Sequence, residues 1–431
     1  MDILSLMLDL GFLLSAFLVA IIVIVTVHEM GHYLVGRWLG IHAEVFSVGF
    51  GRPLLRRRDR HGTLWQLALL PIGGYVKFKG DGSPSSGSAE PVCGSYAGAP
   101  LHARALTVAA GPAVNFLFAI VIFAAMAVIS GLPEHEPRIG ALRSLPVDVG
   151  FQPGDLVLEV GGLPVESLED IRGAAGAIEA SPRIGWTVLR GESRLEVPGP
   201  FPNMPVIDSI RTMSAAQDAG LRVGDVILAV DGDEVHDFGT LRERIFGSDG
   251  ATLDLRVWRD GSVFTVPLTP ARVDMPDGSG AFVTRWMAGF SVDLPFRQAA
   301  RTPGPLEALA IGGQRSLEIV SVSVSAIDNI VRGAISHCNI RGVVTMAEAS
   351  GSAASLGAAS FIAFIAVLSV IIGFMNLMPI PTLDGGHLVL HAWEAVTGRA
   401  PGHRVASAMM TMGMLALIAL MTFGLVNDLM C

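Results

Sequence analysis

The sequence predicts a polytopic α-helical membrane protein with four transmembrane helices, a membrane-associated β-loop and a repeated α+β segment outside the membrane. Three observations carry this prediction. The chain is 51% hydrophobic and only 16% charged, and its mean hydropathy of +0.54 is too high for a soluble protein of 431 residues. Four long stretches lack charged side chains. A ten-residue pattern between the second and third of these stretches occurs twice.

The four stretches without Asp, Glu, Lys or Arg are each long enough to cross a bilayer. The third is longer than one span needs, so only its later part, near residues 361–378, need lie in the membrane. Asp2 and Asp9 precede the first, with no basic residue before Arg37, so we expect an uncleaved span rather than a signal peptide. The stretches are residues 10–27, 105–133, 349–383 and 405–427.

The distribution of basic residues predicts the orientation. Arg and Lys gather between the first and second spans, and Arg399 and Arg404 lie between the third and fourth, so both loops are expected to be cytoplasmic. Both termini and residues 133–350 then face the other side. The net charge of −9 does not suggest nucleic-acid binding. The three cysteines, Cys93, Cys338 and Cys431, form no disulfide pattern.

The sequence of the first expected cytoplasmic loop predicts a β-sheet. Residues 41–79 alternate apolar and polar side chains, with glycines at the expected turns. Residues 64–75 are too apolar for an ordinary cytoplasmic loop, so we expect the sheet to lie against or dip into the membrane with its backbone paired. Residues 81–99 are rich in Gly, Ser, Ala and Pro and resemble a flexible connector.

The external segment contains an internal repeat. Pro-Gly-Asp-Leu-Val-Leu-Glu-Val-Gly-Gly at residues 153–162 corresponds to Val-Gly-Asp-Val-Ile-Leu-Ala-Val-Asp-Gly at residues 223–232. Each copy is followed by a short helical pattern and a β-hairpin pattern. The helices are expected at residues 168–178 and 238–245, and the hairpins at residues 186–197 and 253–266.

The second copy, with Ser-Ala-Ala-Gln-Asp-Ala-Gly-Leu at residues 214–221, resembles a bacterial PDZ domain. The first copy resembles one less well, because its equivalent stretch, residues 145–152, is shorter and lacks the Ala-Gly-Leu turn. We therefore expect two tandem PDZ-like domains at residues 133–201 and 202–297. PDZ domains bind peptides by strand addition. The alternative is that both copies are spacers without a ligand.

His-Glu-Met-Gly-His at residues 28–32 is the clearest chemical motif. Residues four apart share one helix face, so His28 and His32 can bind one metal ion. Glu29 is displaced by about 100° around the helix and can reach a water held by that ion. Two histidines and a glutamate are costly at the end of an apolar span unless they pair or bind something. A pair of structural histidines is the simpler alternative.

A catalytic zinc has three protein ligands and one open position, so a third ligand is needed. The candidate is Asp384, because Pro379 and Pro381 end the third span and leave Asp384 near its cytoplasmic end, at a depth similar to that of His28. Asp384 has an alternative role as the N-cap of a helix at residues 385–396. His387 and His391 also have metal-ligand spacing, but a helix face at the membrane surface explains them more simply.

Five motifs occur in the order of those in the site-2 protease family, and the sequence resembles that family over nearly its whole length. They lie at residues 27–32, 46–51, 70–77, 110–115 and 376–386. The resemblance implies an intramembrane zinc endopeptidase in which His28, His32 and Asp384 hold Zn²⁺, Glu29 is the general base and Asn376 hydrogen-bonds the substrate backbone. A helix–helix hydrogen bond is the alternative for Asn376.

The resemblance also implies a location and a class of substrate. We expect a bacterial inner-membrane protein with its PDZ-like domains and termini in the periplasm and its zinc near the cytoplasmic side. Its substrates would be single-span proteins, such as an anti-sigma factor already trimmed outside the membrane, or signal-peptide remnants. The sequence departs from the family at the shortened first PDZ-like copy, at the connector and at residues 341–346, so substrate choice is the least determined property.

These interpretations divide the chain into eight segments. The main competing hypothesis is a membrane scaffold that binds peptides through its PDZ-like domains and has a structural or inactive zinc site. A metal transporter is disfavoured by the single site. The segments are residues 1–36 (first span with the zinc motif), 37–104 (β-loop and connector), 105–132 (second span), 133–201 and 202–297 (PDZ-like domains), 298–357 (helical linker), 358–398 (third span and following helix) and 399–431 (fourth span).

Overall fold

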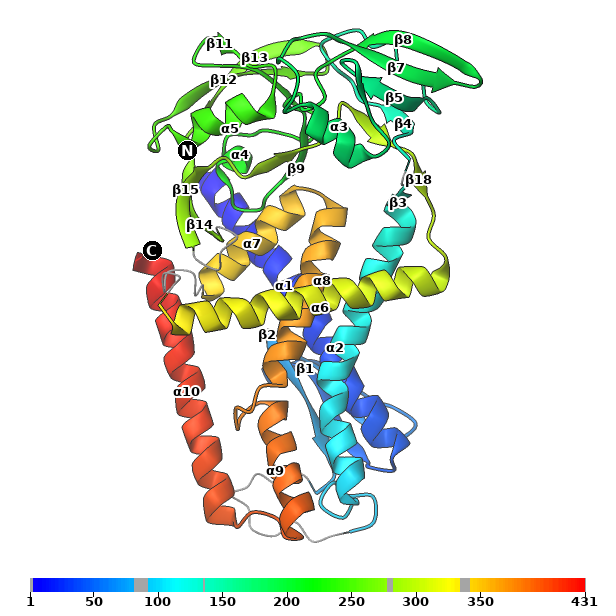
Figure 1. Cartoon of the computed structure of the whole chain (residues 1–431). Helices are drawn as coiled ribbons and strands as arrows, with labels where there is room; N and C mark the ends of the chain where they lie inside the picture. The colour runs from blue at the N-terminus through cyan, green and yellow to red at the C-terminus, as the bar shows by residue number, and fades with distance from the viewer. Residues whose placement is uncertain (1–2, 81–91, 135, 277–281, 334–341, 431) are drawn as a thin grey trace. The chain divides into compact units, whose positions relative to one another are not determined.

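The computed structural model describes residues 3–80, 92–134, 136–276, 282–333 and 342–430 (Figure 1). The chain forms two compact units. The helical unit comprises residues 1–126 and 305–431, and the β-rich unit comprises residues 127–304. Cys338, Cys431 and most of the predicted connector lie outside the described residues.

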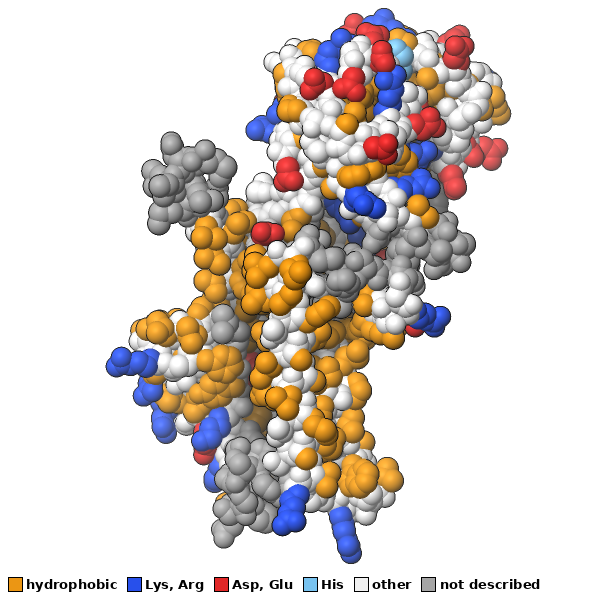
Figure 2. All heavy atoms as spheres, turned by 90° about the vertical axis from the view of Figure 1, so that its left-hand side faces the viewer, with side chains coloured by type: hydrophobic (Ala, Val, Ile, Leu, Met, Phe, Trp, Pro, Cys, Tyr) orange, Lys and Arg blue, Asp and Glu red, His pale blue; other side chains and the backbone are white. Residues whose placement is uncertain are grey.

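Four helices of the helical unit are long and apolar enough to cross a membrane, as predicted. They are α1 (Ile3–Trp38), α2 (Leu101–Ser130), α8 (Ala358–Asn376) and α10 (His403–Met430). The shortest, α8, has 19 residues and is about 28 Å long, close to the thickness of a bilayer core. Figure 2 shows a largely hydrophobic outer surface with Lys and Arg at its lower end, and α10 contributes exposed Leu415, Ile418 and Met421.

The third helix of the core, α8, packs against both α1 and α2. Ile365 and Leu368 of α8 pack with Ile24 of α1, and Ala366 of α8 packs with Ala119 of α2. The α1 and α2 helices approach closely at Gly31, where an added Cβ would lie 2.4 Å from the carbonyl oxygen of Ala110. Small residues allow such close approaches between membrane helices, where apolar burial alone gives little attraction.

The long third apolar stretch contains two helices. The first, α7 (Val343–Ser355), ends just before Gly357, whose φ of +111° favours glycine, and α8 follows directly. After α8 the chain turns at two prolines and enters α9 (Asp384–Thr397). At the other end of the unit, the Asp428 carboxylate of α10 accepts hydrogen bonds from the backbone N–H groups of Gly342, Val344 and Thr345, and so caps α7.

The helix that leads into α7 is α6 (Pro305–Val331), which includes most of the helical pattern expected in the linker. It crosses α2 at Gly312, where an added Cβ would lie 2.3 Å from the carbonyl oxygen of Ile120. A side chain at this position would therefore separate the two helices.

The predicted β-loop is an antiparallel sheet of two bent strands, β1 (Ala43–Arg58) and β2 (Leu64–Phe78). The first part of β1 has neighbours on both sides: Ser47 pairs with Gln66 and also with Tyr75. The sheet packs on α1 through an aromatic cluster in which Phe46 stacks on Trp65 and both rings lie edge-on to Tyr33.

In the β-rich unit the two copies of the sequence repeat form sheets with the same strand order, β6-β5-β7-β8 and β11-β10-β12-β13. Each has its own hydrophobic core and one helix over it. The first copy comprises β5 (Leu156–Val160), β6 (Leu163–Pro164), α3 (Leu168–Ala174), β7 (Ile184–Arg190) and β8 (Ser193–Gly199). The second comprises β10 (Val226–Val230), β11 (Asp233–Glu234), α5 (Phe238–Phe246), β12 (Leu253–Arg259) and β13 (Ser262–Leu268).

Both copies of the repeat contain an equivalent buried ion pair. Asp155 of the first copy accepts two hydrogen bonds from Arg190, and Asp225 of the second accepts two from Arg259. Both carboxylates are 1% exposed and each also accepts a hydrogen bond from the backbone N–H three residues earlier. The copies differ before this aspartate, where only the second has a short helix, α4 (Ala215–Asp218).

Short strands after the second copy pair with strands before each copy. Phe296 of β17 thereby joins the core of the first copy, and β18 closes the unit against β3. The pairs are β16 (Phe290–Val292) with β9 (Ile207–Ile210), β17 (Phe296–Gln298) with β4 (Ile139–Leu142), and β18 (Ala300–Arg301) with β3 (Leu132–Pro133). Strands β14 (Ala271–Pro276) and β15 (Phe282–Met287) form a hairpin.

Candidate metal centre

The two motif histidines lie side by side on α1, which continues as one helix to Trp38. The Nε2 atoms of His28 and His32 are 3.1 Å apart. The side chains of His28 and His32 are only 11% and 12% exposed, because α2 and the β1–β2 sheet cover this part of the helix. Both imidazoles therefore turn away from the surrounding membrane region.

Asp384 reaches the same point from the other end of the chain. Its Oδ2 lies 3.0 Å from Nε2 of His28 and 3.5 Å from Nε2 of His32. It is the first residue of α9, and Gly385 and Gly386 behind it pack directly on backbone: an added Cβ would lie 2.2 Å from the Met378 carbonyl oxygen and 2.4 Å from that of Ile380, respectively. The two glycines thus let the turn after α8 close tightly enough to direct Asp384 inward.

The three ligand atoms fit a zinc ion. Zinc in proteins has Zn–N and Zn–O distances of about 2.0–2.2 Å, so ligands in a tetrahedron stand about 3.3 Å apart. The three observed separations are 3.0, 3.1 and 3.5 Å. Within the described residues, His28, His32 and Asp384 form the group of possible metal ligands. Three ligands leave one tetrahedral position for water.

Helix α2 orients both imidazoles from behind. Nδ1 of His32 lies 2.8 Å from the carbonyl oxygen of Thr107, which can only accept, so Nδ1 carries the proton and Nε2 keeps its lone pair for a metal. Nδ1 of His28 lies 3.2 Å from the amide of buried Asn115, whose Oδ1 is buried without a partner among the described residues. If that amide is turned by 180°, Oδ1 of Asn115 accepts a hydrogen bond from the protonated Nδ1 of His28. Nε2 of His28 then stays unprotonated.

Gly111 on α2 allows this arrangement. An added Cβ would lie 2.3 Å from Nε2 of His32 and 2.8 Å from Nε2 of His28, so any side chain would occupy the place of the ligands. This residue, Thr107 and Asn115 were not identified as site residues from the sequence. A carbonyl that orients a ring leaves no signature in the sequence, whereas an asparagine in the middle of an apolar span was a signal that could have been used.

Glu29 is partly buried and lies beside β2: a Cβ added to Gly74 would be 3.3 Å from Cγ of Glu29. It is not a member of the ligand group. Asn376 is the last residue of α8 and is partly exposed. His391 does not join the centre, because its Nε2 hydrogen-bonds the hydroxyl of Tyr96 at 3.0 Å.

Comparisons with known proteins identify the family of the chain. Residues 16–420 match the model of peptidase family M50. A protein of Agrobacterium fabrum that carries the name of a zinc metalloprotease is 33% identical over 425 residues, 96% of this chain and 94% of its own. A protein of similar name from Rhizobium meliloti is 33% identical over 99% of this chain and 98% of its own. The regulator of sigma-E protease RseP of Escherichia coli is 30% identical over 96% of this chain and 98% of its own.

The family match covers both halves of the proposed centre, from before His28 to beyond Asp384. The relatives align over nearly their full length, so the likeness is not confined to one motif. The chain therefore belongs to peptidase family M50, the site-2 protease family of zinc-dependent metalloproteases.

Proposed function

We propose that this chain is an intramembrane endopeptidase that cleaves single-span membrane proteins, with His28, His32 and Asp384 as zinc ligands and Glu29 as general base. The observation that carries the proposal is the convergence of three ligand atoms, from residues at opposite ends of the sequence, at separations of 3.0–3.5 Å. A carboxylate and two imidazoles at these distances suit catalytic zinc, which keeps a fourth position open.

Bound zinc would polarise a peptide carbonyl and lower the pKa of a water towards neutrality. Glu29 would accept a proton from the water that attacks the peptide carbonyl, and would give that proton to the amine that leaves when the C–N bond breaks. The Thr107 carbonyl and the Asn115 amide keep both imidazoles in the tautomer that presents Nε2. Asn376, at the end of α8, binds the substrate backbone.

A substrate helix hides its own carbonyls, so it must be extended before attack. The end of β2 supports an explanation: residues 74–78 pair with β1 on one side, and the strand passes Glu29 at Gly74. A substrate segment added to the other side of this strand would run beside the general base.

The proposed setting is a bacterial inner membrane, with the zinc near the cytoplasmic side and both termini and the β-rich unit in the periplasm. The basic residues between α1 and α2 support this orientation. The Escherichia coli relative supports the bacterial setting. Substrates would be an anti-sigma factor that has been trimmed outside the membrane, and signal-peptide remnants.

The two copies in the β-rich unit would act as tandem PDZ-like domains that select substrates. Their identical strand order supports a common fold, and a cavity of about 890 Å³ lies along α5 and the strands after it. Phe238, Phe246 and Phe290 line it, together with Arg242 and Arg285, a combination that suits an extended peptide with an acidic end.

The test uses purified protein and a single-span model substrate in detergent. Cleavage should stop on adding a zinc chelator and return when stoichiometric Zn²⁺ is restored. A second substrate with the same sequence but a strongly helix-forming scissile region should be cut more slowly, because it resists extension. Undiminished cleavage after zinc has been removed to background by elemental analysis would refute the proposal.

A further inference from the structure

Helix α9 carries the third metal ligand, yet few apolar contacts hold it. Gly385 and Gly386 are buried, but every residue of α9 from His387 to Thr397 is at least partly exposed. Leu388 and Leu390 are only partly buried. Burial of a few half-exposed leucines contributes little orientation, because apolar contact is non-directional.

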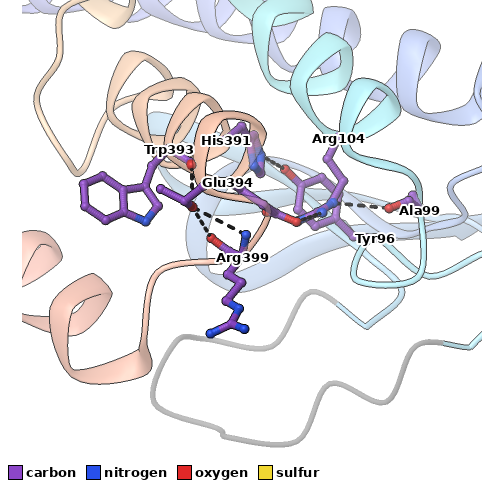
Figure 3. Close-up of polar contacts among 8 residues, drawn as sticks. Tyr96, Ala99, Arg104, His391, Trp393, Glu394 and Arg399 are labelled. Carbon is purple, nitrogen blue, oxygen red and sulfur yellow. Dashed lines mark hydrogen bonds and ion pairs between the residues drawn. The ribbon is translucent and has the colours of Figure 1, made fainter.

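Polar contacts connect this helix to the start of α2 (Figure 3). Arg104 of α2 donates from Nη2 to Oε1 of Glu394 at 2.7 Å and from Nη1 to Oε2 at 3.2 Å. The two side chains are 17% and 21% exposed, so this pair is better shielded than a surface ion pair. Paired N–H···O bonds between guanidinium and carboxylate fix direction as well as distance.

The same face of α9 has a second contact, between His391 and the Tyr96 hydroxyl at 3.0 Å. Burial, and next the Arg104 cation, lowers the pKa of His391 to about 4, although Glu394 opposes this and His387 adds to it. His391 is therefore neutral near pH 7 and accepts the Tyr96 hydrogen. Tyr96 is held in turn by stacking on Phe78 at the end of β2.

These contacts fix the rotation of α9 about its own axis. His391 follows Asp384 by seven residues, which is within about 20° of two full helical turns, so both side chains lie on one face. A side-chain oxygen lies about 5–6 Å from the helix axis, so a rotation of 20° moves it by roughly 2 Å. Zinc ligands tolerate deviations of only about 0.2 Å. A small rotation of α9 would therefore remove Asp384 from the ligand set.

One helix then orients all three ligands. Through Thr107 and Asn115, α2 holds the two histidine rings, and through Arg104, one turn before Thr107, it holds α9. We infer that Arg104 and Glu394, supported by Tyr96 and His391, are positioning residues that set the rotation of α9 and so place Asp384 at zinc-binding distance. This inference rests on the proposed function of Asp384.

The test measures zinc affinity by competition with a chromophoric chelator, and the visible absorption of the Co²⁺-substituted protein, in the full-length chain. Arg104→Ala and Glu394→Ala should each raise the zinc Kd by about 10-fold or more, the range for groups that orient metal ligands without binding the metal themselves. Their Co²⁺ spectra should lose intensity as tetrahedral geometry is lost. The exchanged pair Arg104→Glu with Glu394→Arg should recover most of both signals.

Arg399→Ala is the matched control. This arginine is exposed just after α9, and its hydrogen bonds to Thr397 involve its backbone N–H and C=O. It should keep the wild-type Kd and spectrum. If Arg104→Ala does not fold, Glu394→Gln, which keeps shape but removes the charge, replaces it and should raise the Kd by a smaller factor.

The outcomes separate the two proposals. A wild-type Kd and Co²⁺ spectrum in the Arg104 and Glu394 variants, with zinc lost in Asp384→Ala, would overturn the positioning role and leave the proposed function standing. A weakened site that the exchanged pair does not restore would also overturn it. Full zinc binding in Asp384→Ala would instead overturn the proposed function.

Discussion

The helical unit and the β-rich unit both bury charged groups, but they do so in opposite ways. In the β-rich unit, Asp155 and Asp225 are each satisfied by an arginine and a backbone N–H of the same copy, and this arrangement occurs twice. In the helical unit, His28, His32 and Asp384 come from two helices and face one another. A locally satisfied buried charge supports a fold, whereas converging ligand atoms indicate a bound ion.

The largest expected effect is that of Asp384→Ala. Two remaining imidazoles bind zinc poorly, so the zinc Kd should rise by more than about 100-fold, beyond the range for outer-shell changes, and cleavage should fall to background. Elemental analysis after dialysis measures the zinc. Glu348→Ala, which removes an exposed carboxylate of α7, is the control and should retain full occupancy.

Gly111→Ala should have the next largest effect, although it adds one methyl group. That methyl would lie 2.3 Å from Nε2 of His32, so either α2 or the ring must move. We expect a rise in zinc Kd of about 10- to 100-fold, similar to the loss of an orienting partner. In α1, Gly11→Ala tests the same change where nothing lies within 4 Å, and it should leave the Kd unaltered.

Removal of the β-rich unit should leave zinc binding nearly unchanged. Pro133 of β3 and Ala300 of β18 are paired, so their Cα atoms are about 5 Å apart and a two-residue Asn-Gly turn can replace residues 134–299. The shortened chain should still cleave a substrate with a short external stub, because His28, His32 and Asp384 all belong to the helical unit. It should also accept a substrate with a bulky external domain.

The comparison of those two substrates in the intact chain tests whether the β-rich unit excludes substrates with a bulky external domain. The full-length protein should cleave the stub and refuse the bulky form. Equal cleavage of both by the full-length protein would show that the two copies in the β-rich unit are spacers rather than selectors.

The smallest expected effect on the metal centre is that of Asp155→Ala or Asp225→Ala, which should leave the zinc Kd unchanged while destabilising one copy by about 3 kcal/mol. Amide exchange in the strands of that copy should then accelerate by about 100-fold in the intact chain. Asp218→Ala, at an incompletely buried position of α4, serves as the control. An altered zinc Kd in either variant would contradict the expectation that the metal centre depends on the helical unit alone.

The ion pair of Asp155 and Arg190 predicts that the stability of the first copy depends on pH. Burial alone would raise the pKa of Asp155, but its bonds to Arg190 and to the Gln152 N–H outweigh burial and hold the pKa below its usual 3.8. Since the folded-state pKa is the lower one, this stabilisation is complete above about pH 4 and is lost as the pH falls further. Amide protection factors in the strands of the first copy should therefore fall below that pH, and Asp155→Ala should remove this pH dependence.

The sequence predicted the features that have a period or a motif. The four spans follow from apolar runs, the β1–β2 sheet from alternation and the two copies from their repeat. Asp384 was chosen because prolines ended the third span at the depth of His28, and the structure brings these residues together. The first span was predicted within residues 1–36 from the charge-free run at residues 10–27 and the motif that follows it, and α1 runs to Trp38, where the sheet packs against its polar end.

The rest depended on tertiary contact. Strands such as β17 are too short to show alternation and pair with residues from before the first copy. Gly111 resembles a helix-weakening residue in sequence, and its importance arises from what faces it. Arg104 and Glu394 are separated by most of the chain, so no local pattern could pair them.

The most direct test of the central claim measures zinc content and cleavage together in Glu29→Gln. Because Glu29 lies outside the ligand group and beside β2, the variant should retain stoichiometric zinc and the wild-type Kd while cleavage of a single-span substrate falls below a few per cent of wild type. Substantial cleavage by the zinc-loaded variant would place the general base elsewhere, and loss of zinc would make Glu29 part of the metal site.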